Sequence, residues 1–171
     1  MDGDMVILRL VHIFAGIFWV GGAVMMTDFI VPTARRIGPE GQPFMRGFLK
    51  HTRILVAMPV AALLTTVAGL LLYYRVSDHF NSDWMKSDAG VVLSIGALAG
   101  ILAALVGGLV ITPTTVRIRR LMDKIAERQG PPSDEQRAEM GRLQARNGRT
   151  APLTELLLVI AVVGMAAARY V

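Results

Sequence analysis

The side chain best suited to chemistry in this sequence is His12, which lies within an apolar run. Residues 10–27 contain no Asp, Glu, Lys or Arg, and an ionisable residue inside such a run is by default a functional candidate. Neutral imidazole is also the commonest metal ligand in proteins. Trp19 lies seven residues further on, on the same helix face, and Gly16 between them leaves room for a flat cofactor. The sequence therefore predicts His12, Gly16 and Trp19 as cofactor-binding residues.

Two interpretations of His12 stay open at this stage. In the first, the imidazole binds the iron of haem b, or copper. In the second, it is hydrogen-bonded to a facing helix, and Trp19 only fills the core. A bis-histidine haem with His51 is not expected, because His51 begins the second apolar run at the opposite membrane face, about 20 Å away in depth.

The polar segment 75–88 offers further metal ligands on the same side of the membrane as His12. It contains His79 and Met85, and imidazole and thioether groups both suit copper. The predicted metal ligands are therefore His12, His79 and Met85. The alternative is that His79 and Met85 belong to a solvated loop.

Four apolar runs must position these residues. A bilayer core needs roughly 20 apolar residues of helix, and a backbone in lipid must satisfy its own hydrogen bonds. The fourth run carries only Glu155, and the other three carry no charged residue. We therefore predict an all-α fold, an integral membrane four-helix bundle forming one domain over residues 1–171. The predicted spans are about 5–30, 52–75, 89–113 and 150–170.

The distribution of charge predicts the orientation of the bundle. Basic residues concentrate in segments 31–53 and 114–149, and short loops rich in Lys and Arg stay in the cytoplasm. We therefore expect a cell (inner) membrane protein with both termini on the outer side. The net charge of +5 is explained by contact with an anionic lipid bilayer and requires no nucleic acid.

Residues 114–149 are predicted to form a cytoplasmic helical hairpin between spans three and four. Gly130-Pro131-Pro132 marks the turn, and Ser133 is suited to cap the second helix. Met140 and Leu143 are spaced to face the apolar stripe of residues 118–125. On the same side of the membrane, Pro43 suits a first helical turn, which predicts one continuous helix from about 43 to 75.

Small residues in the third span predict close helix packing. Gly96, Gly100 and Gly107 are spaced so that they form a smooth ridge, and such ridges let helices in lipid approach closely. The ridge serves either the packing of the bundle itself or contact with other membrane subunits. The chain has no cysteine, so disulfides and thiolate ligands are excluded.

The stretch HIFAGIFWVGG at 12–22 resembles the first span of two small membrane families, the copper-resistance D-type proteins and the HemJ-type protoporphyrinogen oxidases. MPVAALLTTVAGLLL at 58–72 is similar to the second span of the HemJ group. The resemblance implies a role in haem or porphyrin handling for His12. It does not extend to protoporphyrinogen oxidase activity, because residues 89–112 lack the lysine of that group.

These observations predict a membrane protein that handles haem or copper through His12. The alternative is a non-catalytic accessory subunit packed in a larger bioenergetic membrane complex. No complete set of catalytic residues is recognisable, so enzyme activity is not predicted.

Overall fold

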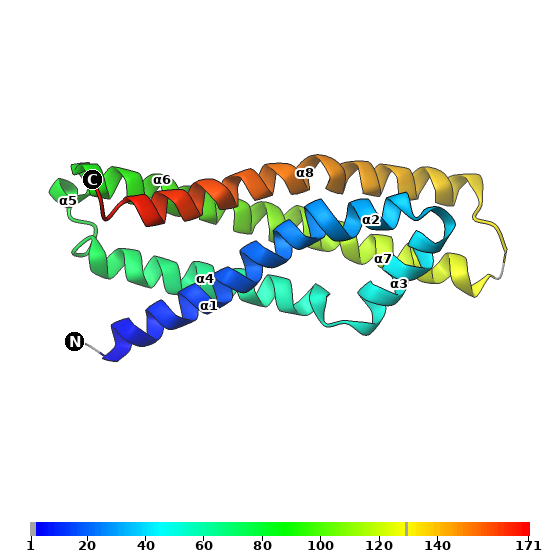
Figure 1. The fold of residues 1–171 in the computed structure, drawn as a ribbon, viewed down its shortest axis with the longest axis horizontal. Coiled ribbons are helices and arrows are strands. Elements are labelled where there is room, and N and C mark those ends of the chain that lie inside the picture. Colours follow the sequence, from blue (N-terminus) through cyan, green and yellow to red (C-terminus); the bar gives the residue numbers. More distant parts are fainter. Residues whose placement is uncertain (1–2, 129) are drawn as a thin grey trace.

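The structure is a computed structural model that describes residues 3–128 and 130–171, and every regular element in this part of the chain is a helix (Figure 1). In chain order the elements are α1 (Gly3–Val24), η1 (Met25–Ile30), α2 (Val31–Arg36), η2 (Gly38–Glu40), α3 (Gly41–His51), α4 (Ile54–Val76), α5 (Ser82–Lys86), α6 (Asp88–Val106), η3 (Gly107–Ile111), α7 (Thr112–Glu127) and α8 (Asp134–Ala167). Four continuous helical stretches in the described residues are long and apolar enough to cross a membrane: Gly3–Arg36, Ile54–Val76, Asp88–Glu127 and Asp134–Ala167.

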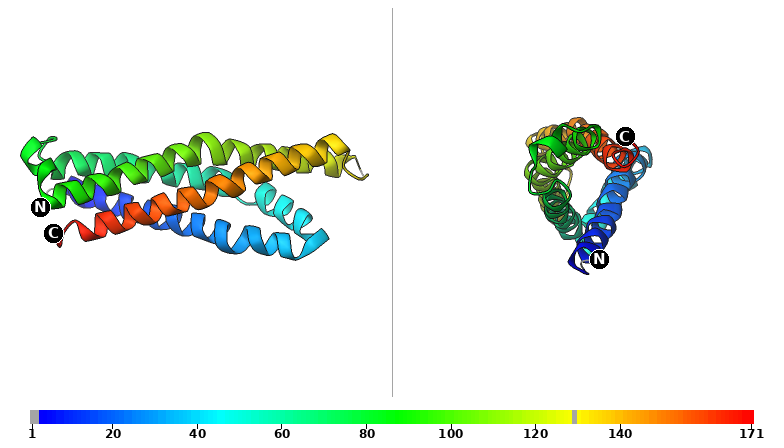
Figure 2. Two further views of the ribbon diagram at one scale, coloured as in Figure 1. Left: turned by 90° about the horizontal axis from the view of Figure 1, so that it is seen from above. Right: turned by 90° about the vertical axis from the view of Figure 1, so that its left-hand side faces the viewer.

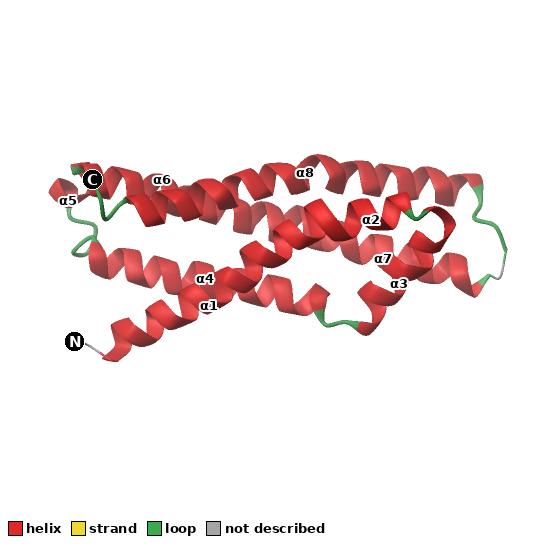
Figure 3. Ribbon diagram, viewed as in Figure 1, coloured by secondary structure: helices red, strands yellow, loops and turns green. Residues whose placement is uncertain are grey.

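The bundle is elongated and has two distinct ends. The chain termini and α5 lie at one end, which we call the terminal end (Figure 1). The connections from α2 to α3 and from α7 to α8 lie at the other, the hairpin end, as the second view confirms (Figure 2). Loops are short; most lie at the two ends, and the connection from α3 to α4 lies part of the way along the bundle (Figure 3). This topology agrees with the predicted helix order.

The distribution of side chains is the reverse of that in a soluble bundle. Large apolar residues point outward, with Phe14, Ile17 and Leu109 more than 60% exposed. The buried positions are dominated by small residues, among them Ala68 and Ala103. Exposed apolar surface of this extent requires an apolar environment, and small residues between helices are typical of packing in lipid.

The four long helices pack as two close pairs. In the pair α6–α8, a Cβ atom placed on Gly164 would lie 2.9 Å from the Cα of Gly96, so the two backbones touch directly. In the pair α1–α4, a Cβ on Gly22 would lie 2.7 Å from the sulfur of Met58. Contacts between the two pairs are fewer, which leaves space along the centre of the bundle.

Two π-helical turns, η1 and η3, interrupt the long helices, and each precedes a proline. Pro32 and Pro113 follow them in the first turns of α2 and α7. A proline lacks an N–H group and clashes with the carbonyl four residues earlier, which here belongs to Asp28 in η1 and Leu109 in η3. The wider π turn accommodates that clash without breaking the helix.

The hairpin of α7 and α8 forms as predicted. The Ser133 hydroxyl accepts a hydrogen bond from the Gln136 N–H at 3.2 Å, and the Gln136 side chain accepts one from the Ser133 N–H at 3.0 Å. Leu121 and Leu143 meet in a buried cluster. The full cluster contains Ile118, Leu121, Met122 and Leu143, with Met45, Ile125 and Met140 against it.

The predicted continuous helix over 43–75 is wrong. Helix α3 ends at His51 and α4 begins at Ile54, because Thr52 is extended, with φ −101° and ψ 160°. The Phe48 carbonyl accepts from both the Thr52 N–H at 3.1 Å and the Thr52 hydroxyl at 2.7 Å, and the same hydroxyl accepts from the Ile54 N–H at 3.4 Å where α4 begins. The break turns α3 back toward α7, where Arg46 Nε donates to Asp123 Oδ1 at 2.9 Å.

Candidate cofactor site

His12 is held in one orientation by the facing helix α4. Its Nδ1 lies 2.8 Å from the backbone carbonyl oxygen of Thr65. A carbonyl can only accept, so Nδ1 carries a proton, and in a neutral imidazole with that tautomer the lone pair belongs to Nε2. The ring lies against Gly69, where a Cβ atom would stand 2.8 Å from Cε1 of His12. The same arrangement, one ring nitrogen donating to a carbonyl, is the usual way of orienting a metal-binding imidazole.

His12 lines a cavity of about 310 Å³ between the helix pairs, toward the terminal end. We call it the terminal cavity. Its walls come from α1, α4, α6 and α8, and include Arg9, Tyr73 and Met165. The hydroxyl of Thr65 is buried beside it and has no hydrogen-bond partner in the described residues. The cavity thus combines a fixed imidazole, a cation and a thioether within apolar surroundings.

Trp19 and Gly16 take different positions. Trp19 is buried at the centre of the bundle with Ala61, Ala103 and Leu158, and it also forms part of the terminal cavity wall. Gly16 faces Thr65, whose Cγ2 would be 3.5 Å from a Cβ at that position. Gly16 therefore brings α1 close to α4, and it is Gly69 that provides the space for the imidazole.

The structure does not bring His79 and Met85 to His12. The His79 ring packs edge-on against Tyr74 with centroids 4.6 Å apart, and its Nδ1 lies 3.3 Å from the Asp78 carboxylate. Tyr74 comes five residues after Gly69, which at 3.6 residues per turn is about 140° around α4. His79 therefore lies on another face of α4. Met85 is in the short helix α5 and is 37% exposed.

His51 lies far from His12, as predicted. It is the last residue of α3, just before α4 begins, whereas His12 contacts Thr65 at the middle of α4, which is about 17 Å along that helix from its first residue. The described residues contain no group of three or more His, Asp or Glu side chains placed to hold a metal ion.

The glycine ridge of α6 is largely used inside the chain. A Cβ on Gly96 would lie 3.1 Å from the Ala161 carbonyl oxygen, and one on Gly100 would lie 3.6 Å from the Ala161 Cβ. Both therefore pack against α8, which is the first of the two roles considered for the ridge. Gly107, in η3, has open space beside it.

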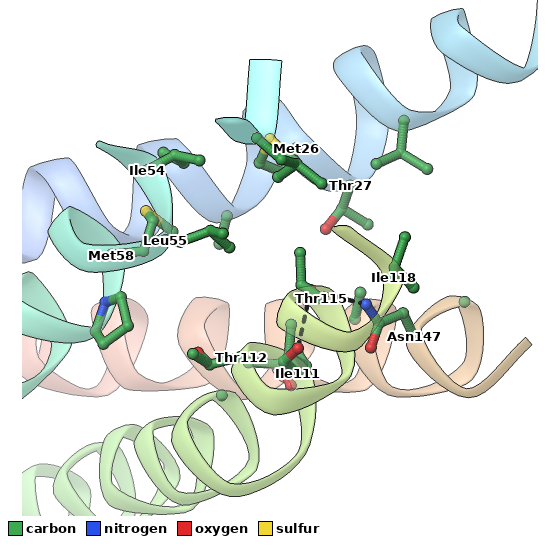
Figure 4. A pocket seen from close by; sticks show the side chains of 18 of the residues that line it. Met26, Thr27, Ile54, Leu55, Met58, Ile111, Thr112, Thr115, Ile118 and Asn147 are labelled. Atoms are coloured by element: carbon green, nitrogen blue, oxygen red, sulfur yellow. Dashed lines mark hydrogen bonds between the residues drawn. The ribbon is translucent and has the colours of Figure 1, made fainter. Parts of the chain in front are cut away.

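A second, larger cavity of about 860 Å³ lies between the helix pairs toward the hairpin end. We call it the hairpin cavity. Both π turns line it, through Met26 and Thr27 of η1 and Ile111 of η3, and Asn147 of α8 faces the same space (Figure 4). Trp19 borders both cavities and so stands between them.

Comparisons with protein-family models, curated proteins and solved structures found no match for this chain. The candidate site is therefore defined by its own geometry. Three residues of that geometry were not singled out from the sequence: Thr65, Gly69 and Met165. A glycine facing an intramembrane histidine is a usable signal for Gly69, whereas Met165 looks like any core methionine until α8 is placed.

Proposed function

We propose that this chain is a multi-pass membrane protein that binds haem b in the terminal cavity, with His12 as the protein ligand to iron. The observation that carries the proposal is the hydrogen bond from His12 Nδ1 to the Thr65 carbonyl. It holds the ring in one orientation beside a cavity and makes Nε2 the nitrogen with which a neutral imidazole would bind a metal.

The residues of the cavity fit haem better than copper. Copper sites draw several soft ligands from the protein, and His12 shares no contact with His79 or Met85. Haem iron takes its in-plane ligands from the macrocycle and needs only axial ligands from the protein. The thioether of Met165, on α8, also lines the cavity and would be available as a second protein ligand to the iron of a bound haem.

The remaining walls suit the two halves of a porphyrin. Tyr73, Leu93 and Ile101 offer apolar and aromatic surface for the ring. Arg9, in the first half of α1, also lines the cavity. Its guanidinium is suited to pair with a propionate carboxylate of the porphyrin. Bound there, haem would supply one-electron redox chemistry, while the chain fixes its orientation and keeps water away.

An absorption spectrum of the gently purified protein tests the proposal. We expect a Soret band that disappears in His12→Ala and persists in His51→Ala, the matched control at the opposite end of the bundle. Added imidazole should restore part of the band to His12→Ala. Unchanged helicity by circular dichroism would show that the variant is folded.

A colourless protein that takes up no added haem would overturn the proposal. If it also co-purified in fixed ratio with a larger membrane complex, the accessory-subunit interpretation would replace it. His12 would then serve as a packing residue bonded to Thr65.

We also propose that the terminal end faces outward from the cell membrane and that the hairpin end is cytoplasmic, as the basic residues of α7 and α8 favour. Single cysteines at Ser82 and Ser133 test this orientation, because the chain has no other cysteine. An impermeant thiol reagent on intact cells should label position 82 only. Labelling at position 133 without permeabilisation would reverse the orientation.

A further inference from the structure

We infer that the hairpin cavity binds one anionic phospholipid, with the head group at Arg35 and the tail directed toward Trp19. This site is separate from the haem site proposed above. Its volume of about 860 Å³ falls within the range of about 300–1,000 Å³ that small-molecule sites occupy.

The shape of the cavity matches one lipid molecule in one leaflet. Ile54 and Thr66 both line it along α4, and twelve residues of helix correspond to about 18 Å. The hydrocarbon of one leaflet is about 15 Å deep, half of a core of about 30 Å. The cavity is therefore long enough for an acyl chain and a head group, and it ends at the buried ring of Trp19.

The polar and apolar walls are separated along that length. The part nearest Trp19 is lined by Ala62, Leu63 and Ala104. Toward the hairpin end the lining includes Gln42, Gln144, Asn147 and Arg35. A ligand that satisfies both parts must be amphipathic and must point its polar group toward the hairpin end.

Asn147 forms part of the cavity wall beside Arg35. Its Nδ2 donates to the Thr115 hydroxyl at 2.9 Å, which donates in turn to the Ile111 carbonyl of η3 at 2.9 Å (Figure 4). This chain of bonds fixes the amide and ties α8 to α7 and η3. The Asn147 Oδ1 atom is fully buried and lies out of reach of a ligand in the cavity.

Arg35 supplies the charge. One of its guanidinium nitrogens, Nη2, would lie 3.8 Å from a Cβ placed on Gly148, so the group rests on α8 beside Asn147. Arg35 forms no ion pair with a carboxylate of the described residues. A guanidinium without a carboxylate partner is complementary to the phosphate of an anionic lipid.

Native mass spectrometry of the delipidated full-length protein tests the inference, with phosphatidylglycerol and phosphatidylcholine offered together in equal amounts. We expect one retained phosphatidylglycerol, favoured at least tenfold over phosphatidylcholine. Arg35→Gln should abolish the preference for the anionic lipid. Arg142→Gln removes the same charge from an exposed position on α8 and should change nothing.

Filling the cavity gives a second variant that does not disturb the head-group residues. Gly108 lines the cavity and has open space beside it, so Gly108→Leu should fold normally and reduce lipid occupancy. Gly141→Leu is its matched control, because Gly141 also has open space but lies outside the cavity lining.

Three results would overturn the inference. The first is equal retention of lipid by the unmodified protein and by Gly108→Leu. The second is equal retention of the two lipids by the unmodified protein. The third is displacement of the lipid by soluble glycerol phosphate, which would show that the head group alone is recognised and the tail is not bound.

Discussion

The two cavities of the bundle differ in how the chain makes them. In the terminal cavity the decisive group, His12, is held by one backbone carbonyl across the tight α1–α4 interface. In the hairpin cavity the space comes from two π turns and from the separation of the helix pairs. A polar side chain within an apolar run can therefore be recognised in a sequence, whereas a volume made by backbone irregularities depends on how helices are placed.

The largest effect that would separate the two regions is expected from Leu121→Asp. Leu121 is 6% exposed in the cluster that joins α7 to α8, and a buried unpaired carboxylate there should cost at least about 3 kcal/mol. Amide exchange of residues 115–148 should accelerate and lipid retention should fall, while the Soret band persists. Leu121→Met conserves volume and is the control.

If Leu121→Asp removed the Soret band as well, the two ends of the bundle would fold as one cooperative unit. The comparison between independent cavities would then fail. Slow exchange of the hairpin in Leu121→Asp would instead contradict the buried packing of α7 on α8.

Gly69→Ala tests the terminal cavity alone. The added Cβ would stand 2.8 Å from Cε1 of His12, so the ring must move and its bond to the Thr65 carbonyl must weaken. Loss of such an orienting contact typically lowers metal affinity about 10- to 100-fold, and we expect haem affinity to fall within that range. Gly21→Ala, with open space beside it, should leave haem affinity unchanged, as measured by haem titration.

Met165→Leu should have a smaller, spectroscopic effect. A methionine axial ligand raises the reduction potential of haem, so its replacement should lower the midpoint potential while the Soret band remains. A redox titration measures this change. An unaltered potential would remove Met165 from the iron's coordination and leave His12 as the only protein ligand.

The smallest effect is expected at the ion pair between Arg46 and Asp123. Their side chains are 34% and 22% exposed, and partly exposed pairs contribute about 0.2–1 kcal/mol. Arg46→Gln should therefore shift the unfolding midpoint only slightly. Arg137→Gln, which removes a more exposed pair with Asp134, should shift it less, and the reverse order would contradict the packing of α3 on α7.

The helices and the hairpin could be predicted because their signals are local. The apolar runs give the four helices, and Ser133 with Gln136 gives the start of α8. The end of α3 at Thr52 could not be predicted, since threonines whose hydroxyl bonds to a nearby backbone carbonyl are found both within helices and at their ends. The π turns before Pro32 and Pro113 were missed. A proline indicates that the helix is disturbed nearby, but it does not indicate whether the disturbance is a kink, a break or a π turn.

The candidate site was predicted only in part. His12 was found because an ionisable group in an apolar run is conspicuous. Gly16 was assigned the space that Gly69 provides, because the facing helix was unknown. His79 and Met85 were grouped with His12 because all three were expected on the same side of the membrane. In the structure His79 packs on Tyr74, which lies on a different face of α4 from the Gly69 that contacts His12.

The position of Trp19 bears on the continuity of the two cavities. Trp19, Thr66 and Ile101 line both of them, and the buried indole is the bulkiest of these three side chains. A smaller residue at position 19 would therefore widen the opening through which one cavity communicates with the other.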